Sequence, residues 1–325
     1  MRVLGAKLVG QSAQWLLGKM VGHAVILGYH RVDDGPDPYG LAVSPERFAE
    51  HLAVIARMAR PLPLNELPEL LATGRVPKRT VCVTFDDGYA DVLHTAKPLL
   101  EEFGIPATVF VTSGALGREL WWDRLDRVAS AAVASGNRFT LAIGKSEFVW
   151  PTEDRASSKG ALRQALYPLL RAMDQTEREA ALNRLADLDG VFPRPGADPI
   201  GLRRVVSHDE LRRLAEGSLV EIGAHTVTHP ALSRLRPEHQ REEIAGCRRD
   251  LEAALGRQIS GFSYPFGDTG AGAVTMVQEE GFLYACESRN AVAWRRTDQF
   301  ALPRFWVPNW DGRRFAGWLE QWLDD

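Results

Sequence analysis

Two acidic residues and two histidines stand where strand-like segments end, and these residue types can bind a metal ion and move protons. Residues 81–91 read VCVTFDDGYAD, an apolar, β-branched run that ends at Asp86 and Asp87. Further along, LVEIGAHTVTH places His225 and His229 four residues apart after a second strand-like run. Two imidazoles and one carboxylate, with positions left for water, are typical of an open catalytic site for zinc or a similar ion. The pattern therefore indicates a hydrolase.

The two acidic residues are expected to differ in role, because adjacent residues of a strand point in opposite directions. One of Asp86 and Asp87 would bind the metal while the other stays free as a base. The alternative is that Asp-Asp-Gly is only a turn after a strand. For His225 and His229 the alternative is a pair of structural histidines. Their spacing suits one helical turn, but Pro230 restricts His229 towards an extended conformation, so a tight loop is equally expected.

Composition bounds the class of protein. The 325 residues are 45% hydrophobic, enough for one large α/β domain or for one domain with an insertion. The net charge of −3 gives no sign of a nucleic-acid partner. Cys82, Cys247 and Cys286 form no CxxC pair, so neither a disulfide framework nor a zinc ribbon is indicated. A reducing, cytoplasmic location is the expectation.

Short apolar strands alternate with helical stretches, which predicts a largely parallel sheet covered by helices, as in a (β/α) barrel. In such barrels the catalytic groups lie at the carboxyl ends of the strands. Helix starts are indicated at Ser44-Pro45 and at Ser207 with Glu210, and a long helix from Pro237 is expected to stop near Gly256. The strands are predicted at 24–30, 81–85, 107–112, 219–224, 259–265 and 282–286.

Residues 116–205 differ from the rest of the chain. They are rich in Ala, Leu, Arg and Glu and predict two or three helices, broken by KSEFVWPTED and by VFPRPGADPIG. We interpret this segment as a helical insertion.

The motifs TFDDGY, HTVTH and a strand ending in YPFG resemble those of the polysaccharide deacetylases, the NodB-homology carbohydrate esterases. The resemblance runs over about residues 24–115 and 205–310. It implies a distorted, incomplete (β/α)7 barrel with a helical insertion. The catalytic barrel would comprise 24–115 and 206–325, with the insertion at 116–205 and an N-terminal helix at 1–23.

The resemblance also implies roles for the residues of the first two motifs. Asp87, His225 and His229 correspond to the metal ligands, and Asp86 corresponds to the general base. The cofactor would be a divalent metal, with zinc expected and cobalt, nickel or iron left open.

The general acid is predicted from the lack of a histidine in the last part of the sequence. Many relatives supply it from a histidine near the end of the domain, but this sequence has no histidine after His239. Some relatives resemble a permuted form in which an N-terminal YHRV strand carries the acid, and AVILGYHRV places His30 there. We therefore assign His30 as the general acid. The alternative is a structural histidine beside Arg31.

The third motif departs from the pattern of the family, since Ser263 stands where Arg is expected and Phe266 where Tyr is expected. The backbone amide of Phe266, with Tyr264 and Pro265 beside it, is predicted at the oxyanion and substrate site. Arg304 is predicted to replace the missing Arg next to the base. The alternative is a structural or surface arginine.

Nine tryptophans are many for this length, and sugar rings stack well on aromatic faces. Trp122 is the residue we expect to contact substrate, although any single Trp can equally fill a core. The other tryptophans on segments that could frame a cleft are Trp121, Trp306 and Trp310. His23, His51, His94, His208 and His239 are interpreted as ordinary helix or surface residues.

The expected function is removal of N-acetyl groups from an N-acetylated sugar in a polysaccharide, oligosaccharide or glycan precursor, as in exopolysaccharide biosynthesis. The alternatives are an O-deacetylase, another amide hydrolase acting on non-peptide bonds, or a non-catalytic carbohydrate-binding relative. Residues 1–22 lack an uninterrupted apolar signal region and can instead form an amphipathic helix. That helix would pack on the domain or attach to the inner membrane surface or a polysaccharide-assembly partner.

Overall fold

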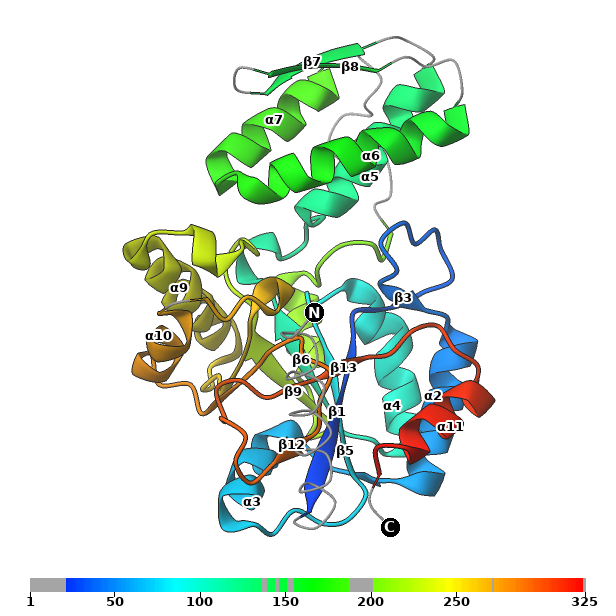
Figure 1. Ribbon diagram of the computed structural model, residues 1–325, viewed down its shortest axis with the longest axis vertical. Helices are drawn as coiled ribbons and strands as arrows, with labels where there is room; N and C mark the ends of the chain where they lie inside the picture. Colours follow the sequence, from blue (N-terminus) through cyan, green and yellow to red (C-terminus); the bar gives the residue numbers. More distant parts are fainter. Residues whose placement is uncertain are drawn as a thin grey trace, which may run out of the picture. The chain divides into compact units, whose positions relative to one another are not determined.

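The computed structural model describes residues 22–135, 139–143, 146–150, 155–187, 201–270 and 272–323. The chain forms two compact units (Figure 1): unit 1 joins Met1–Gly114 to Val206–Asp325, and unit 2 is Ala115–Val205. Unit 2 thus spans the segment interpreted as an insertion. Residues 1–21 lie outside the described residues, so the N-terminal helix and its membrane or partner contact stay predictions. His23, placed in that helix by the sequence, instead begins the first strand.

Unit 1 is built on a parallel sheet of short, buried strands. The strands follow the order β11-β10-β9-β6-β5-β1-β12, parallel from β11 to β1, with β12 joining antiparallel. Burial on both faces is typical of a parallel sheet covered by helices, and it explains the unbroken apolar runs. The bounds are β1 His23–Tyr29, β4 Arg60–Pro61, β5 Thr80–Phe85, β6 Ala107–Val111, β9 Val220–Ala224, β10 Gly261–Ser263, β11 Tyr284–Cys286, β12 Ala293–Trp294 and β13 Phe305–Trp306, with β2 Arg31–Val32 pairing β3 Ala42–Val43.

One segment links β11, the strand at one end of this sheet, to β1 near the other end. Leu302 forms a parallel bridge with Cys286 of β11, and a few residues later β13 pairs with β1. The sheet is therefore curled into a distorted, incomplete (β/α) barrel, which confirms the predicted fold class (Figure 1). Because β13 lies beside β1, Arg304 and His30 come to the same part of the barrel.

Three helices of unit 1, α2, α8 and α9, begin where the sequence indicated, and α9 also ends there. Ser44 accepts a hydrogen bond from the Arg47 amide, Ser207 and Glu210 form a capping box, and Gly256 ends α9 with a φ of 67°. Among the described residues no helix is both long enough and apolar enough to cross a bilayer. The α-helices are α2 Pro45–Met58, α3 Leu67–Thr73, α4 Lys97–Phe103, α8 His208–Leu214, α9 Pro237–Leu255, α10 Ala273–Glu279 and α11 Gly312–Glu320, with single turns at η1 Leu64–Glu66, η2 Val92–Ala96, η3 Ser113–Ala115, η4 Leu232–Arg234 and η5 Pro265–Gly267.

Unit 2 contains three helices and a hairpin in its described part. The helices are α5 Trp121–Ser135, α6 Arg155–Ala172 and α7 Gln175–Asp187, and the antiparallel hairpin pairs β7 Phe139–Ile143 with β8 Ser146–Trp150. The helices agree with the sequence. The hairpin was not predicted, because KSEFVWPTED was interpreted only as a break between helices. The aromatic rings of Trp121 and Tyr167 lie 4.9 Å apart and join α5 to α6.

Candidate active site

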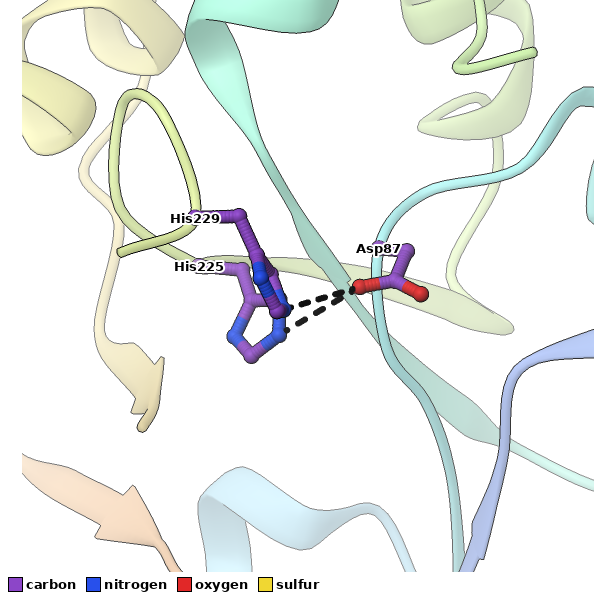
Figure 2. A group of neighbouring side chains, drawn as sticks. All are labelled: Asp87, His225 and His229. Carbon is purple, nitrogen blue, oxygen red and sulfur yellow. Dashed lines mark ion pairs between the residues drawn. The ribbon is translucent and has the colours of Figure 1, made fainter. Parts of the chain in front are cut away.

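Asp87, His225 and His229 converge in unit 1, from the end of β5 and from the loop after β9 (Figure 2). Nε2 of His225 lies 3.5 Å and Nε2 of His229 lies 3.4 Å from Oδ1 of Asp87. One ligand atom of each residue lies within 4.8 Å of the other two, and all three residues are buried. These are the three residues that the sequence predicts as metal ligands.

The two histidines are carried by an irregular loop rather than by a helical turn. The His225 amide donates to the carbonyl of Val111, 3.0 Å away, and ties the loop to β6. The His229 amide donates to Oγ1 of Thr226 at 3.0 Å. Thr226 and His229 have φ values of 65° and 54°, in the left-handed region that helices do not use. Of the two conformations expected from the sequence, the tight loop is therefore the one observed.

The hydrogen bond of His225 leaves its second nitrogen ready for a metal ion. Nδ1 lies 2.8 Å from the carbonyl oxygen of Ser263, which can only accept, so Nδ1 carries the proton. Nε2, which faces Asp87, then keeps its lone pair. Burial lowers the pKa of His225 and so favours the neutral ring that metal ligation requires. Two imidazoles and a carboxylate in this arrangement fit a divalent cation such as zinc.

Asp86 lies beside this group but is bound by different partners. Arg304 donates from Nη1 to Oδ1 and from Nη2 to Oδ2, both at 2.7 Å, and the Ser263 hydroxyl donates to Oδ2 at 3.1 Å. Nε2 of His225 is 3.9 Å from Oδ2. Burial raises the pKa of Asp86, but the charges of Arg304 and His225 and the hydrogen bonds of Arg304 outweigh it, so the pKa lies well below its usual range. Asp86 is thus an ionised carboxylate next to the metal-ligand group.

Arg304 also binds Ser263, the residue that stands where the family motif has an arginine. Nη2 of Arg304 donates to the Ser263 hydroxyl at 2.8 Å, and Nη1 donates to Oγ1 of Thr84 at 3.1 Å. The arginine is fully buried. The structure therefore brings Arg304 to Asp86, where the sequence expected it, and its part in catalysis stays a proposal.

His30 follows β1 and stacks on Trp306, with ring centroids 4.3 Å apart and planes at 20°. Burial lowers the pKa of His30 to about 4, the charge of Asp86 opposes this, and the charge of Arg304 adds to it. His30 stacks on the ring that also contacts Arg304, the arginine bound to Asp86, so it lies in the same cluster as the proposed base. At neutral pH its imidazole is uncharged.

Trp306 contacts both the predicted acid and the arginine. Its ring centroid lies 5.0 Å from Cζ of Arg304, within the range of a cation–π contact. Gly28 makes room for this ring, because a Cβ at position 28 would lie 2.8 Å from the indole atoms Cε3 and Cζ3. The sequence named Trp306 only among residues that could frame a cleft, and nothing in it marked Gly28.

Two residues that the sequence places at the substrate, Tyr264 and Trp122, are buried in this structure. The hydroxyl of Tyr264 donates to the carbonyl of Phe300 at 3.0 Å, and the side chain has no exposed surface. Trp122 is 4% exposed and packs edge-on against Trp121 in unit 2, with centroids 5.3 Å apart. Both side chains pack in the interior, and their contact with a substrate stays a prediction.

The other two residues of the third motif lie at the edge of the site. Pro265 is buried and begins η5, and Phe266 follows with a φ of 58°. The Phe266 ring meets the ring of His229 edge-on at 4.7 Å. The role of the Phe266 amide at an oxyanion stays a prediction.

A curled (β/α) barrel with a metal-ligand group and a fixed carboxylate at the ends of its strands defines a class, the metal-dependent barrel hydrolases. The family model described as "Polysaccharide deacetylase" matches residues 73–139 and 199–285, which include both acidic residues and both histidines of the site. The chain belongs to the polysaccharide deacetylase family, whose members depend on a metal ion.

The relatives and solved structures agree with this assignment. YxkH of Bacillus subtilis (strain 168), named among the polysaccharide deacetylases, is 20% identical over 312 residues, 95% of this chain and 80% of that protein. Poly-beta-1,6-N-acetyl-D-glucosamine N-deacetylase of Staphylococcus aureus is 29% identical over 110 residues, 30% of this chain and only 38% of that relative. The structure of the Streptococcus pyogenes deacetylase PplD in complex with acetate gives a TM-score of 0.61 at 15% identity, covering 93% of this chain and 99% of that one. At this identity the structural likeness establishes the fold.

Proposed function

We propose that this protein is a metal-dependent deacetylase that removes N-acetyl groups from an N-acetylated glycan. The observation that carries the proposal is that the two adjacent carboxylates have different partners. Asp87 faces His225 and His229, whereas Asp86 is held by Arg304. One acidic residue is thus available as a ligand and the other as a base.

Asp87, His225 and His229 would hold the ion. When bound, such an ion lowers the pKa of water and polarises the carbonyl that is attacked. Asp86 accepts the proton that the attacking water gives up. Among the described residues, Arg304 occupies one acceptor site on each oxygen of Asp86 and Ser263 a second site on Oδ2, so Oδ1 retains capacity for that proton.

Cleavage of the carbon–nitrogen bond leaves acetate and an amine that needs a proton. His30 is the proposed donor, since it stacks on Trp306, which contacts the arginine bound to Asp86, and it is not one of the three ligand residues. Burial lowers the pKa of His30 to about 4, so its resting ring is neutral and would first have to take up the proton that Asp86 receives from the attacking water. His30 would then give that proton to the amine. Trp306 holds the imidazole plane by stacking.

The substrate class and the metal are part of the proposal. The name of the Staphylococcus aureus relative supports an N-acetylglucosamine polymer or a precursor of one. Two histidines and one carboxylate support zinc, while cobalt, nickel or iron would suit the same ligands.

The test is acetate release from matched N-acetylated and O-acetylated saccharides by the zinc-reconstituted protein. The proposal expects release from the N-acetylated members. Release only from the O-acetylated members would favour the O-deacetylase. Glycan binding and metal binding without any release would favour the non-catalytic carbohydrate-binding alternative.

A further inference from the structure

The loop that carries both histidine ligands has a conformation that its own sequence does not favour. Thr226 and His229 both have positive φ, and Thr226 is β-branched, which makes that backbone region costly. Such a conformation persists only where the surroundings hold it. The contacts of the loop with the rest of unit 1 therefore decide where the two imidazoles lie.

One side of the loop is held by the segment after β6. The Ser113 amide donates to the carbonyl of Thr226 at 3.2 Å, and the Gly114 amide donates to the carbonyl of Val227 at 2.9 Å. The approach at Gly114 is close, because a Cβ there would lie 2.5 Å from that carbonyl oxygen.

The other side of the loop is held by α9, through one carboxylate. Oε2 of Glu243 accepts from the amides of Val227 and Thr228, both at 2.8 Å. Oε1 of Glu243 accepts from the hydroxyl of Thr228 at 2.6 Å. One helical turn later, Gly246 lets the loop approach the helix, since a Cβ there would lie 3.0 Å from Cγ2 of Val227.

We propose that Glu243 is a positioning residue for the metal centre, which it serves by fixing the loop between His225 and His229. Both of its carboxylate oxygens bind the loop, so Glu243 acts through the two ligands and not as a ligand itself. Residues that orient the metal-binding side chains affect the affinity for the metal even though they do not contact the ion. The inference rests on the metal centre of the proposed function, but metal binding tests it without any turnover.

The experiment measures the affinity of the full-length protein for Zn²⁺ by competition with a chromophoric chelator, and the visible spectrum of the Co²⁺ form. Glu243→Ala is expected to weaken Zn²⁺ binding by about 10- to 100-fold and to alter the Co²⁺ bands. The matched control is Glu242→Ala, which removes the exposed neighbouring carboxylate of α9 and should leave both readouts unchanged.

The conservative variant Glu243→Gln should restore most of the affinity. Its amide oxygen can accept from both backbone amides as Oε2 does, and its NH₂ group can donate to the Thr228 hydroxyl. Wild-type affinity in Glu243→Ala would overturn the proposal. Equal losses in Glu243→Gln and Glu243→Ala would also overturn it, because the hydrogen-bond geometry would then not be what matters.

Thermal unfolding of each metal-free variant in chelator shows whether a loss of Zn²⁺ affinity comes from the lost hydrogen bonds of Glu243 or from a protein that no longer folds. If Glu243→Ala does not fold, Thr228→Val decides, since it keeps both backbone amides and the β-branched shape but removes the bond to Oε1. Thr228→Val is expected to bind Zn²⁺ several-fold more weakly. Unchanged affinity would contradict the proposed role of Glu243. A wild-type protein that binds Zn²⁺ but releases no acetate would defeat the proposed function while leaving this inference standing.

Discussion

Arg304 binds both oxygens of Asp86 at 2.7 Å although the two residues are 218 positions apart in the chain. Such paired bonds fix the plane of a carboxylate as well as its charge. The pairing depends on the 302–306 segment, which bridges β11 and then runs beside β1. The closure of the barrel and the orientation of the proposed base are thus one structural feature.

Replacing Arg304 by lysine should reduce deacetylation by about 100-fold or more, because a lysine keeps the charge but cannot form the paired bonds. Turnover and bound zinc are measured on the same samples. Arg57→Lys, on the exposed face of α2, is the control and should behave as wild type. Full turnover in Arg304→Lys would show that the orientation of Asp86 does not limit the reaction.

Replacing His30 by glutamine should lower turnover by about 100-fold or more while the zinc content stays at the wild-type value. The reason is that His30 is proposed to supply a proton and lies outside the ligand group. His208→Gln, at an exposed histidine, serves as the matched control. An unchanged rate in His30→Gln would reduce His30 to a structural partner of Trp306.

Replacing Gly28 by alanine should destabilise the protein by about 1–3 kcal/mol, because the new methyl group overlaps the indole of Trp306. Displacing that ring should also lower turnover, since His30 stacks on it. Urea unfolding and acetate release are both measured. Gly317→Ala is the control, because a Cβ in that exposed part of α11 meets no atom within 4 Å and alanine favours helix. Equal stability of the two variants would contradict the overlap.

The buried side chain of His51 is expected to make the protein less stable in mild acid. The sequence suggested an ordinary helix or surface residue, but the side chain is fully buried, with Nε2 2.8 Å from the Trp310 carbonyl and Nδ1 3.3 Å from the Tyr29 hydroxyl. Burial lowers the pKa of His51 to about 4. The folded state therefore binds a proton less readily than the unfolded chain, whose histidine has a pKa of about 6.5.

The contribution of His51 to the free energy of unfolding is fully present above the pKa of the unfolded chain and is lost as the pH falls from about 6.5 to about 4. The pKa difference sets the largest possible loss, which is on the order of 3 kcal/mol. The measurement is the free energy of unfolding at pH 7 and at pH 5 for wild type and His51→Gln. The variant should be less stable at pH 7 but lose less stability on acidification. The same pH dependence in both proteins would contradict the assignment.

The ends of the central strands could be predicted because their signals are local. Asp86 and His225 each directly follow a strand-like, largely apolar run, so the sequence places them at one end of a parallel sheet. Caps such as Ser207 with Glu210 are local as well, since both partners lie within one helical turn.

The missed features depend on contacts between distant segments. Glu243 is one of several charged residues on α9, and only the packing of that helix against the histidine loop distinguishes it. Ser263 was interpreted as a lost arginine, whereas its hydroxyl joins Asp86 to Arg304 and its carbonyl orients His225. The place of Tyr264 at a strand end likewise did not reveal that its hydroxyl binds the Phe300 carbonyl in the core.

The most direct test of Asp86 as the base and Asp87 as a metal ligand compares two isosteric variants in the same assay. Zinc content and acetate release from an N-acetylated oligosaccharide are measured for Asp86→Asn and Asp87→Asn, with Asp209→Asn, at an exposed position on α8, as control. We predict that Asp86→Asn keeps its zinc and loses turnover, whereas Asp87→Asn loses zinc and turnover together. Wild-type turnover in Asp86→Asn, or full zinc occupancy in Asp87→Asn, would contradict the proposed site.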